Sequence, residues 1–209
     1  TSSVNGGEDV ALAQTAFVNA IAVRPADWAL LAALGSALVW SPRSNVSLYG
    51  ETARVTEAAR LGVQIALGTD WIVSGSSSLL RELACADAWN RERLGGFFTD
   101  EDLWLMATRN VADASGLLGR LGLLAPGRLA DIAVFDGSVN PDFRAVIDAA
   151  PQDVALVLRS GRALYGEAAV VEALAGAGCD ALDVCGAPRR ICAQAELGDI
   201  VYVELPQAG

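Results

Sequence analysis

The sequence predicts an α/β protein whose strands are parallel and connected by helices. Short apolar runs alternate with segments of helical pattern, and the connections between them are short, which is typical of repeated β–α–β units. Hydrophobic residues make up 53% of the chain and charged residues only 19%. This apolar content indicates strands that are buried on both faces, or a piece of a larger fold whose core surface needs a partner.

The first predicted elements form a strand, a helix and a second strand. The apolar run at residues 15–23 predicts a buried strand. Pro25 is well placed to open a helix over residues 26–34, and Gly35 to end it. A second buried strand is predicted at residues 36–40, where the next apolar run lies.

The next predicted elements lead to a third strand. A loop is expected at residues 41–50 and a helix at residues 51–61, which ends before Gly62. The third strand, residues 63–67, runs into the sequence Gly68-Thr69-Asp70. Further helices are predicted at about 77–93, 100–108 and 110–116. Three such units are too few to close an eight-stranded barrel.

The rest of the chain predicts a small β module packed on the α/β part. Strands are expected at residues 129–135, 154–158 and 163–165, with turns at Asp-Gly and Ser-Gly pairs. Helices are expected at residues 140–150 and 167–177, and a segment that contains cysteine and glycine follows. The expected division is therefore residues 1–120 for the α/β part and residues 121–209 for the β module with its helical, cysteine-bearing tail.

Charge and composition exclude several classes of function. The chain has 15 Lys and Arg against 25 Asp and Glu, a net charge of −10, which disfavours binding to a nucleic-acid backbone. No apolar run approaches the length of about 20 residues needed for a membrane span. The chain contains no histidine, so it cannot form a Ser-His-Asp triad or a histidine-bound zinc site by itself.

The ends of the chain bear on its origin and compartment. The chain begins with Thr1 rather than Met, so we expect that the natural start, and any targeting signal, was removed or lies outside it. One disulfide among Cys179, Cys185 and Cys192 would suit an exported protein, and free buried thiols are an equal alternative. The compartment stays open, with the cytoplasm preferred over export.

Polar residues lie where the three predicted strands end, and functional side chains of parallel α/β folds lie at such ends. Asp70 is the first candidate, because a carboxylate that emerges there can bind a cation and accept a proton from water. The alternative is a loop or helix-capping acid. Acidic and basic residues on the following helix, Arg81, Glu82 and Asp87, are predicted to be solvated. The strand-end candidates are Asn19, Ser41, Arg43, Ser44, Asn45, Thr69 and Asp70.

Five stretches carry a family resemblance, and they follow one another in order. They read WSPRSNVSLYG, GVQIALGTD, LWLMATRNVADASGL, GLLAPGRLADIAVFDG and DVALVLRSGRALYG. This set, over about residues 15–166, resembles the second half of the amidohydrolase superfamily, in its deaminase and chlorohydrolase-like branch. The resemblance implies the carboxy-terminal part of a (β/α)8 TIM-type barrel, here strands six to eight, plus strands of a small β-sandwich.

The resemblance also implies roles for individual residues. Asp70 would bind the metal and shuttle a proton from the attacking water. The loop with Arg43, Ser44 and Asn45 would lie near the substrate, although a turn built from Asn and Ser is an equal alternative. Apart from the resemblance, the position of Trp71 directly after Asp70 makes it a candidate to line a substrate pocket, although an aromatic side chain at a strand end more often serves packing.

The sequence departs from the family pattern at its sixth strand. Asn19 occupies the position of a histidine that polarises substrate or binds metal in the family, and Ala22 that of a second histidine. Asparagine donates hydrogen bonds, but it is a poor transition-metal ligand and shuttles no protons at neutral pH. The histidines of strands one and five would precede Thr1. The one divalent metal expected in the complete enzyme, zinc or iron, would therefore need ligands from elsewhere.

Two functions follow from this reading. In the first, the chain is part of a metal-dependent hydrolase that cleaves C–N or related bonds of a small molecule with a metal-activated water, and is inactive alone because it lacks histidine. In the second, it belongs to a metal-free, non-catalytic relative that acts as a binding or assembly subunit. Either function predicts a partner: the missing amino-terminal half, a partner chain, or copies of itself in a homo-oligomer.

Overall fold

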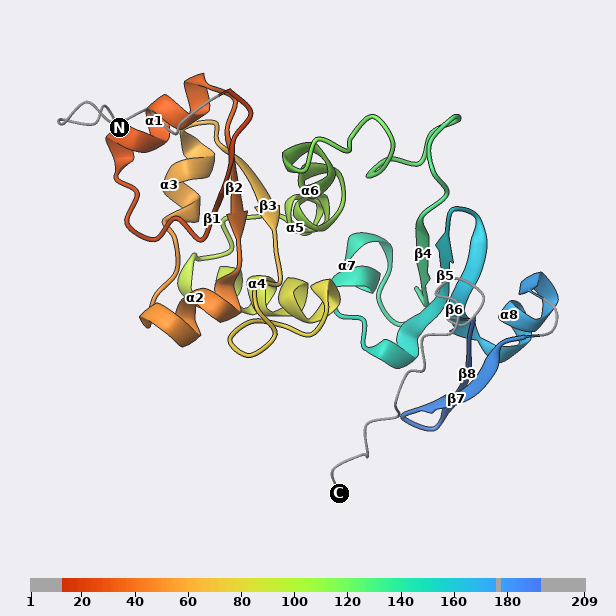
Figure 1. Ribbon diagram of the computed structural model, residues 1–209. Helices are drawn as coiled ribbons and strands as arrows, with labels where there is room; N and C mark the ends of the chain where they lie inside the picture. Colours follow the sequence, from red (N-terminus) through yellow and green to blue (C-terminus); the bar gives the residue numbers. More distant parts are fainter. Residues whose placement is uncertain (1–12, 176–177, 193–209) are drawn as a thin grey trace. The chain divides into compact units, whose positions relative to one another are not determined.

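The computed structural model describes residues 13–175 and 178–192 (Figure 1). The chain divides into two compact units. The first comprises Thr1–Arg128 and Asn140–Asp148, and the second comprises Leu129–Val139 and Ala149–Gly209. Residues 1–10, whose polar and Gly-rich sequence predicts a loop or a frayed end, lie outside the described residues. None of the described helices is long and apolar enough to cross a membrane.

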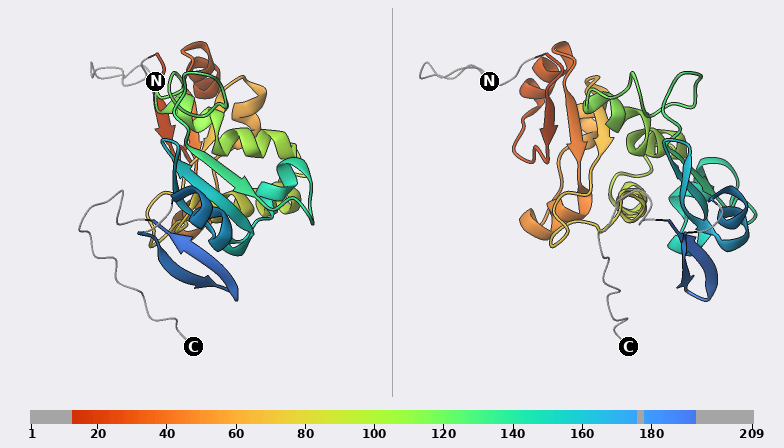
Figure 2. Two further views of the ribbon diagram at one scale, coloured as in Figure 1. Left: turned by 90° about the vertical axis from the view of Figure 1, so that its right-hand side faces the viewer. Right: turned by 45° about the vertical axis from the view of Figure 1, so that its right-hand side comes forward.

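A three-stranded parallel sheet forms the centre of the first unit. Its strands are β1 (Ala16–Val18), β2 (Ala37–Trp40) and β3 (Gln64–Leu67), in that order, and they lie side by side in Figure 2. Helices α1 (Pro25–Ala33) and α3 (Val55–Arg60) belong to the connections between them. The predicted α/β class with parallel strands is thus confirmed.

The first strand is shorter than predicted and is largely exposed rather than buried. The expected loop at residues 41–50 is also wrong. Asn19 and Ala20 adopt positive φ angles of 65° and 45°, which turn the chain out of the extended conformation soon after Val18. Helix α2 (Pro42–Tyr49) replaces the loop. Pro is favoured at a first helical position, and Gly50, at φ 75°, ends the helix in the left-handed conformation.

The remaining helices of the first unit are α4 (Leu79–Arg93), α5 (Asp100–Ala107), α6 (Arg109–Ala114) and α7 (Asp142–Ile147). Thr99 caps α5 as its sequence predicts, because its hydroxyl accepts the backbone N–H of Asp102 at 3.1 Å. The strands and helices share one core, whose largest fully buried side chains include Trp28, Leu38, Trp40, Leu67, Leu83 and Leu103.

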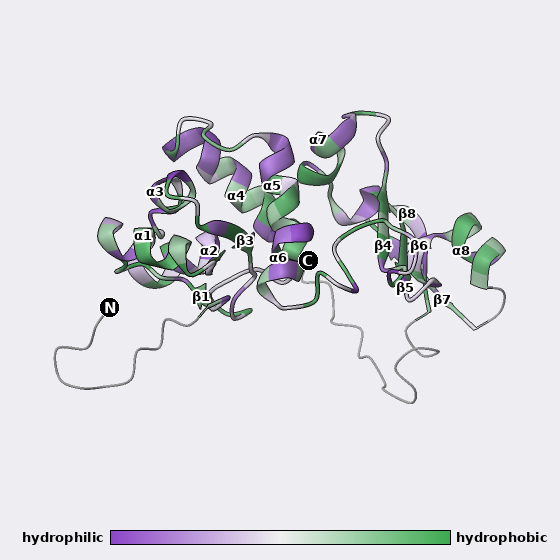
Figure 3. Cartoon of the chain, turned by 90° about the horizontal axis from the view of Figure 1, so that it is seen from above, coloured by the Kyte–Doolittle hydropathy of each residue, from purple (hydrophilic) through white to green (hydrophobic). Residues whose placement is uncertain are grey.

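The second unit contains a five-stranded antiparallel sheet of order β4-β5-β6-β8-β7. Strands β4 (Ile132–Phe135), β5 (Val154–Arg159) and β6 (Arg162–Glu167) confirm the three predicted ones. A 3-10 turn, η1 (Pro151–Asp153), precedes β5. Helix α8 (Ala168–Ala175), mostly green in Figure 3, follows β6. The last two residues of the helix predicted there, 176 and 177, lie outside the described residues.

The cysteine-bearing tail contains a hairpin that the sequence analysis did not predict. Strands β7 (Asp180–Val184) and β8 (Ala187–Ile191) pair antiparallel, and β8 also pairs with β6. A disulfide joins Cys179 and Cys192 at the open end of the hairpin, whereas Cys185 at its turn is free and exposed. The structure therefore agrees with the first of the two predicted alternatives, one disulfide among these cysteines.

Candidate active site

Asp70 lies just beyond the end of β3, as predicted, with its side chain at the surface. Its Oδ2 atom accepts hydrogen bonds from the Ser44 hydroxyl at 2.6 Å and from Asn19 Nδ2 at 3.1 Å. The bond from Ser44 is the main reason that the pKa of Asp70 lies below its usual value, and the bond from Asn19 adds to it. The site therefore holds a carboxylate that stays ionised and faces solvent.

A chain of hydrogen bonds runs from this carboxylate into the core. Asn45 Nδ2 donates to Asn19 Oδ1 at 2.7 Å, and Thr52 Oγ1 donates to Asn45 Oδ1 at 3.0 Å. The indole Nε1 of Trp40 then donates to Thr52 Oγ1 at 2.6 Å. Both polar groups of the Asn19 side chain are thus engaged, which fixes its orientation toward Asp70.

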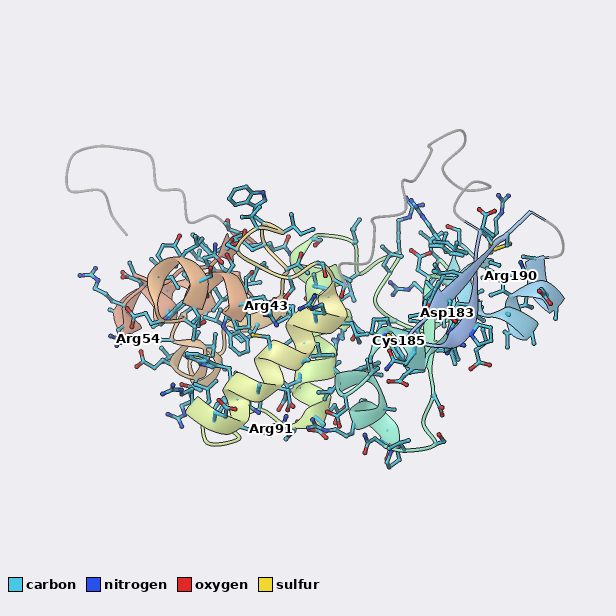
Figure 4. The ribbon with its side chains drawn as sticks, turned by 90° about the horizontal axis from the view of Figure 1, so that it is seen from below. Arg43, Arg54, Arg91, Asp183, Cys185 and Arg190 are labelled. Carbon is cyan, nitrogen blue, oxygen red and sulfur yellow. A yellow bond between two sulfur atoms is a disulfide. The ribbon has the colours of Figure 1, made fainter. Side chains whose placement is uncertain are left out.

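The ends of the three parallel strands meet at this point, because parallel strands present their carboxyl ends at one edge of a sheet. Asn19 follows β1, Ser44 and Asn45 lie in the first turn of α2 after β2, and Asp70 follows β3. Four of the predicted candidates are thus brought together. The side chain of Arg43, labelled in Figure 4, is instead bonded to the loop before α4, where its Nε donates to Ser76 Oγ at 2.8 Å.

A buried carboxylate that the sequence analysis missed lies beside Arg43. Glu82 of α4 accepts the backbone N–H of Arg43 at Oε1, 3.0 Å away, and the Ser76 hydroxyl at Oε2. Its side chain is fully buried, as is nearly all of Asp87, so the prediction that these two acids are solvated is wrong; Arg81 is exposed as predicted. Burial is the main reason that the pKa of Glu82 is raised.

One signal in the sequence places Glu82 on the inner face of its helix. Residue 82 precedes the buried Ala86 by four positions and Asn90 by eight, so all three lie on one side of an α-helix. Asp87 is paired differently: its Oδ2 forms ion pairs with Arg91 of the same helix and with Arg144, and the second pair joins α4 to α7. Charged residues on a helix are usually exposed to solvent. For Glu82, the helical spacing from Ala86 and Asn90 is the evidence for burial.

The loop at residues 71–78 is hydrogen-bonded to residues of α2 and α4. Its Ser74 Oγ lies 2.9 Å from Ser44 Oγ, and its Ser76 bridges Arg43 and Glu82. Trp71, which was predicted to line a pocket, follows Asp70 directly and its side chain is 64% exposed. The two serines therefore tie the loop to the first turn of α2, next to Asp70.

Gly75 is expected to be essential for the shape of this loop. A Cβ atom at this position would lie 1.9 Å from the carbonyl oxygen of Thr69, so Gly75→Ala must displace the backbone. We expect a loss of about 1–3 kcal/mol in the free energy of unfolding, measured in urea. Gly119→Ala is the control, because a Cβ there meets nothing within 4 Å. Equal stability of both variants would contradict the tight packing of the loop.

Glu82 is expected to make stability depend on pH. Its folded-state pKa is raised, so between the unfolded value of about 4.3 and the folded value the native state holds more protons. Wild-type stability should therefore fall as the pH rises through this window, and Glu82→Gln should remove that part of the fall. Urea unfolding at a series of pH values measures it, with Glu92→Gln of the same helix, an exposed residue, as the control. An unchanged pH profile in Glu82→Gln would show that Glu82 is not the cause.

The residues of the site do not form a metal centre by themselves. Within residues 13–175 and 178–192, no group of three His, Cys, Asp or Glu side chains could hold a metal ion. Asp70 offers one carboxylate, and the Asn19 carbonyl oxygen already accepts a bond from Asn45. Ser44 contributes only a hydroxyl. Among the described residues of this site, Asp70 therefore supplies the one carboxylate that could bind a metal.

Comparison with known proteins identifies the family of the chain. The model of the amidohydrolase family matches residues 4–164. A 5-methylthioadenosine/S-adenosylhomocysteine deaminase from Pyrococcus abyssi is 34% identical over 140 residues, which cover 65% of this chain and 32% of that protein. The same enzyme from Teredinibacter turnerae is 35% identical over 113 residues, 53% of this chain and 26% of that protein. The chain thus spans about a third or less of the length of these relatives.

Solved structures show the same fold. An adenosine deaminase from Xanthomonas campestris with bound zinc superposes with a TM-score of 0.63 at 24% identity, over 71% of this chain and 36% of that one. The zinc complex of atrazine chlorohydrolase from Arthrobacter aurescens gives a TM-score of 0.61 at 24% identity, over 74% of this chain and 36% of that one. The chain belongs to the amidohydrolase family, in its deaminase and chlorohydrolase-like branch.

Proposed function

We propose that this chain is the carboxy-terminal part of a hydrolase that cleaves a C–N or related bond of a small molecule. Asp70 is the reactive group. Its carboxylate accepts a proton from the attacking water as the new C–O bond forms, and returns a proton to the leaving nitrogen. The observation that carries the proposal is the placement of this carboxylate: it lies at the end of β3, ionised through Ser44 and Asn19, and exposed to solvent.

The fold supplies the scaffold for this role. In the proposal, β1, β2 and β3 are strands six to eight of a (β/α)8 barrel, within residues 1–120, and residues 121–209 return into a β-sandwich. Among the described residues, no strand pairs with the outer edge of β1 or of β3. Open strand edges favour pairing with another chain segment, which supports a partner: the missing amino-terminal half, or further copies of this chain.

The metal and the substrate belong to the complete protein. The divalent ion that the family resemblance implies, zinc or iron, needs donors beyond the described residues, so we assign it to the chain together with its missing half. This chain alone is proposed to be inactive. The related deaminases are named for methylthioadenosine, S-adenosylhomocysteine and 5'-deoxyadenosine. Their names favour an amino-substituted purine nucleoside as the small-molecule substrate.

A second candidate is a metal-free binding or assembly subunit. Asn19 favours it, because an amide that donates to Asp70 and accepts from Asn45 occupies the position where the family has a histidine. Such a network of amides and one carboxylate suits recognition of a polar small molecule without turnover. Arg43 and Trp71 remain candidates for substrate contact in either function.

One experiment on the complete protein separates the two candidates. We expect it to release ammonia from one or more adenosine derivatives and to retain about one equivalent of zinc or iron after gel filtration. Binding of the same nucleosides without ammonia release, and without bound metal, would favour the subunit. Absence of both turnover and binding would contradict both candidates for this substrate class.

A further inference from the structure

The first turn of helix α2 is held in an unusual way. The first amides of a helix have no partner within it, and the N-cap side chain normally accepts one of them. Ser41 is the N-cap of α2, but its side chain caps no amide. The Arg43 N–H instead reaches Glu82 Oε1 at 3.0 Å, an acceptor from another helix. Glu82 thus performs the capping that Ser41 does not.

The same carboxylate also fixes the loop over the site. Its second oxygen accepts the hydroxyl of Ser76, and Ser76 in turn accepts Arg43 Nε–H at 2.8 Å. Glu82, Ser76 and Arg43 therefore form a closed ring of hydrogen bonds between α4, the loop at residues 71–78 and α2. A fully buried group with these partners has little freedom to rotate.

What this ring positions is the first turn of α2, from which Ser44 and Asn45 reach the site. Ser44 Oγ lies 2.6 Å from Asp70 Oδ2, and Asn45 Nδ2 lies 2.7 Å from Asn19 Oδ1. Both residues follow Arg43 directly, so a rotation or shift of that turn moves both contacts together. Asp70 would then lose the Ser44 hydroxyl and Asn19 would lose the amide of Asn45 at the same time, whereas the bond between Asn19 and Asp70 does not involve α2.

We propose that Glu82 is a positioning residue, whose buried carboxylate caps α2 and thereby sets Ser44 against Asp70 and Asn45 against Asn19. The inference rests on the proposed function only in taking Asp70 as the reactive carboxylate. Glu82 itself is buried, and its side-chain hydrogen bonds go to Arg43 and Ser76 rather than to Asp70 or Asn19. It acts through the backbone of Arg43 and through Ser76.

The test compares three variants of the full 209-residue chain. Glu82→Leu keeps much of the volume and removes both acceptors, whereas the carbonyl of Glu82→Gln can still accept the Arg43 N–H. Asn90→Leu is the matched control. Asn90 is also buried on α4, and its two side-chain hydrogen bonds go to the backbone of Phe98, at 2.8 and 3.0 Å, rather than to α2. The readout is the side-chain amide NMR signals of Asn19 and Asn45, with the melting temperature recorded alongside.

We expect Glu82→Leu to move the side-chain amide signals of Asn19 and Asn45, and Glu82→Gln to leave them near their wild-type positions. Asn90→Leu should lower the melting temperature without moving these signals. Should Glu82→Leu not fold, Glu82→Asp replaces it: its carboxylate is one methylene shorter, and we expect the same signals to move. Unmoved signals in the variant that folds, or equal movement in Asn90→Leu, would overturn the proposal. The signals are read without turnover, so the result stands apart from whether the complete protein is a hydrolase.

Discussion

Replacing Asp70 with Asn is expected to lower the hydrolytic turnover of the complete protein by about 10²–10⁴-fold. The amide has the shape of the carboxylate, but it does not accept a proton at neutral pH. The Ser44 hydroxyl can still donate to the amide oxygen, so the local fold should persist. Because Asp70 is exposed, the free energy of unfolding should change little. Steady-state measurement of ammonia release, together with urea unfolding, separates a chemical loss from a structural one.

Asp136→Asn is the matched control for this experiment. Asp136 is also an exposed aspartate whose pKa is lowered, mainly by the backbone N–H of Ser138, but it lies in the second unit. We expect its turnover to equal that of the wild type. Full turnover in Asp70→Asn would remove Asp70 from the proposed chemistry. An equal loss in both variants would show that the effect is not specific to the site.

The parallel sheet and the convergence of its strand ends were predictable because they depend on local pattern. Strand β2 is a continuous apolar run and β3 is apolar after Gln64. Parallel strands connected by helices bring their carboxyl ends to one edge. That rule alone places Asn19, Ser44 and Asp70 near each other. The length of β1 was not predictable in this way, because the apolar run continues past Asn19 while the backbone turns there.

The partners within the site were beyond a reading of the sequence. The bonds from Trp40 to Thr52 and from Arg43 to Glu82 join positions 12 and 39 residues apart, and no local pattern specifies which polar groups pair in a core. The β7–β8 hairpin was missed for another reason. Its strands carry Asp, Pro and Arg, residues that β-propensity disfavours or leaves neutral, and its pairing with β6 fixes it.

Replacing Trp40 with Ala is expected to produce the largest loss of stability in the first unit. The Trp40 side chain is fully buried in the core, 6.3 Å from the ring of Phe98 between centroids. Removal of so large a buried side chain costs about 3–5 kcal/mol. Trp40→Phe keeps much of the apolar contact but removes the donor to Thr52, so we expect a smaller loss of about 1–3 kcal/mol. Urea unfolding, followed by the fluorescence of the remaining tryptophans, measures both.

Trp71→Ala provides the comparison within the same unit, because most of the Trp71 side chain faces solvent. Its removal should change the free energy of unfolding by no more than about 0.5 kcal/mol. A loss as large as that of Trp40→Ala would mean that Trp71 packs against protein after all, in a partner or in a second copy of the chain.

Trp40→Phe is also expected to affect the side chains of the candidate site. In this variant Thr52 loses the donor that orients it toward Asn45. The side-chain amide NMR signals of Asn45 and Asn19 should therefore move even where the fold is retained. Such a movement would show that the buried Trp40 affects the orientation of Asn19, which donates to the Asp70 carboxylate.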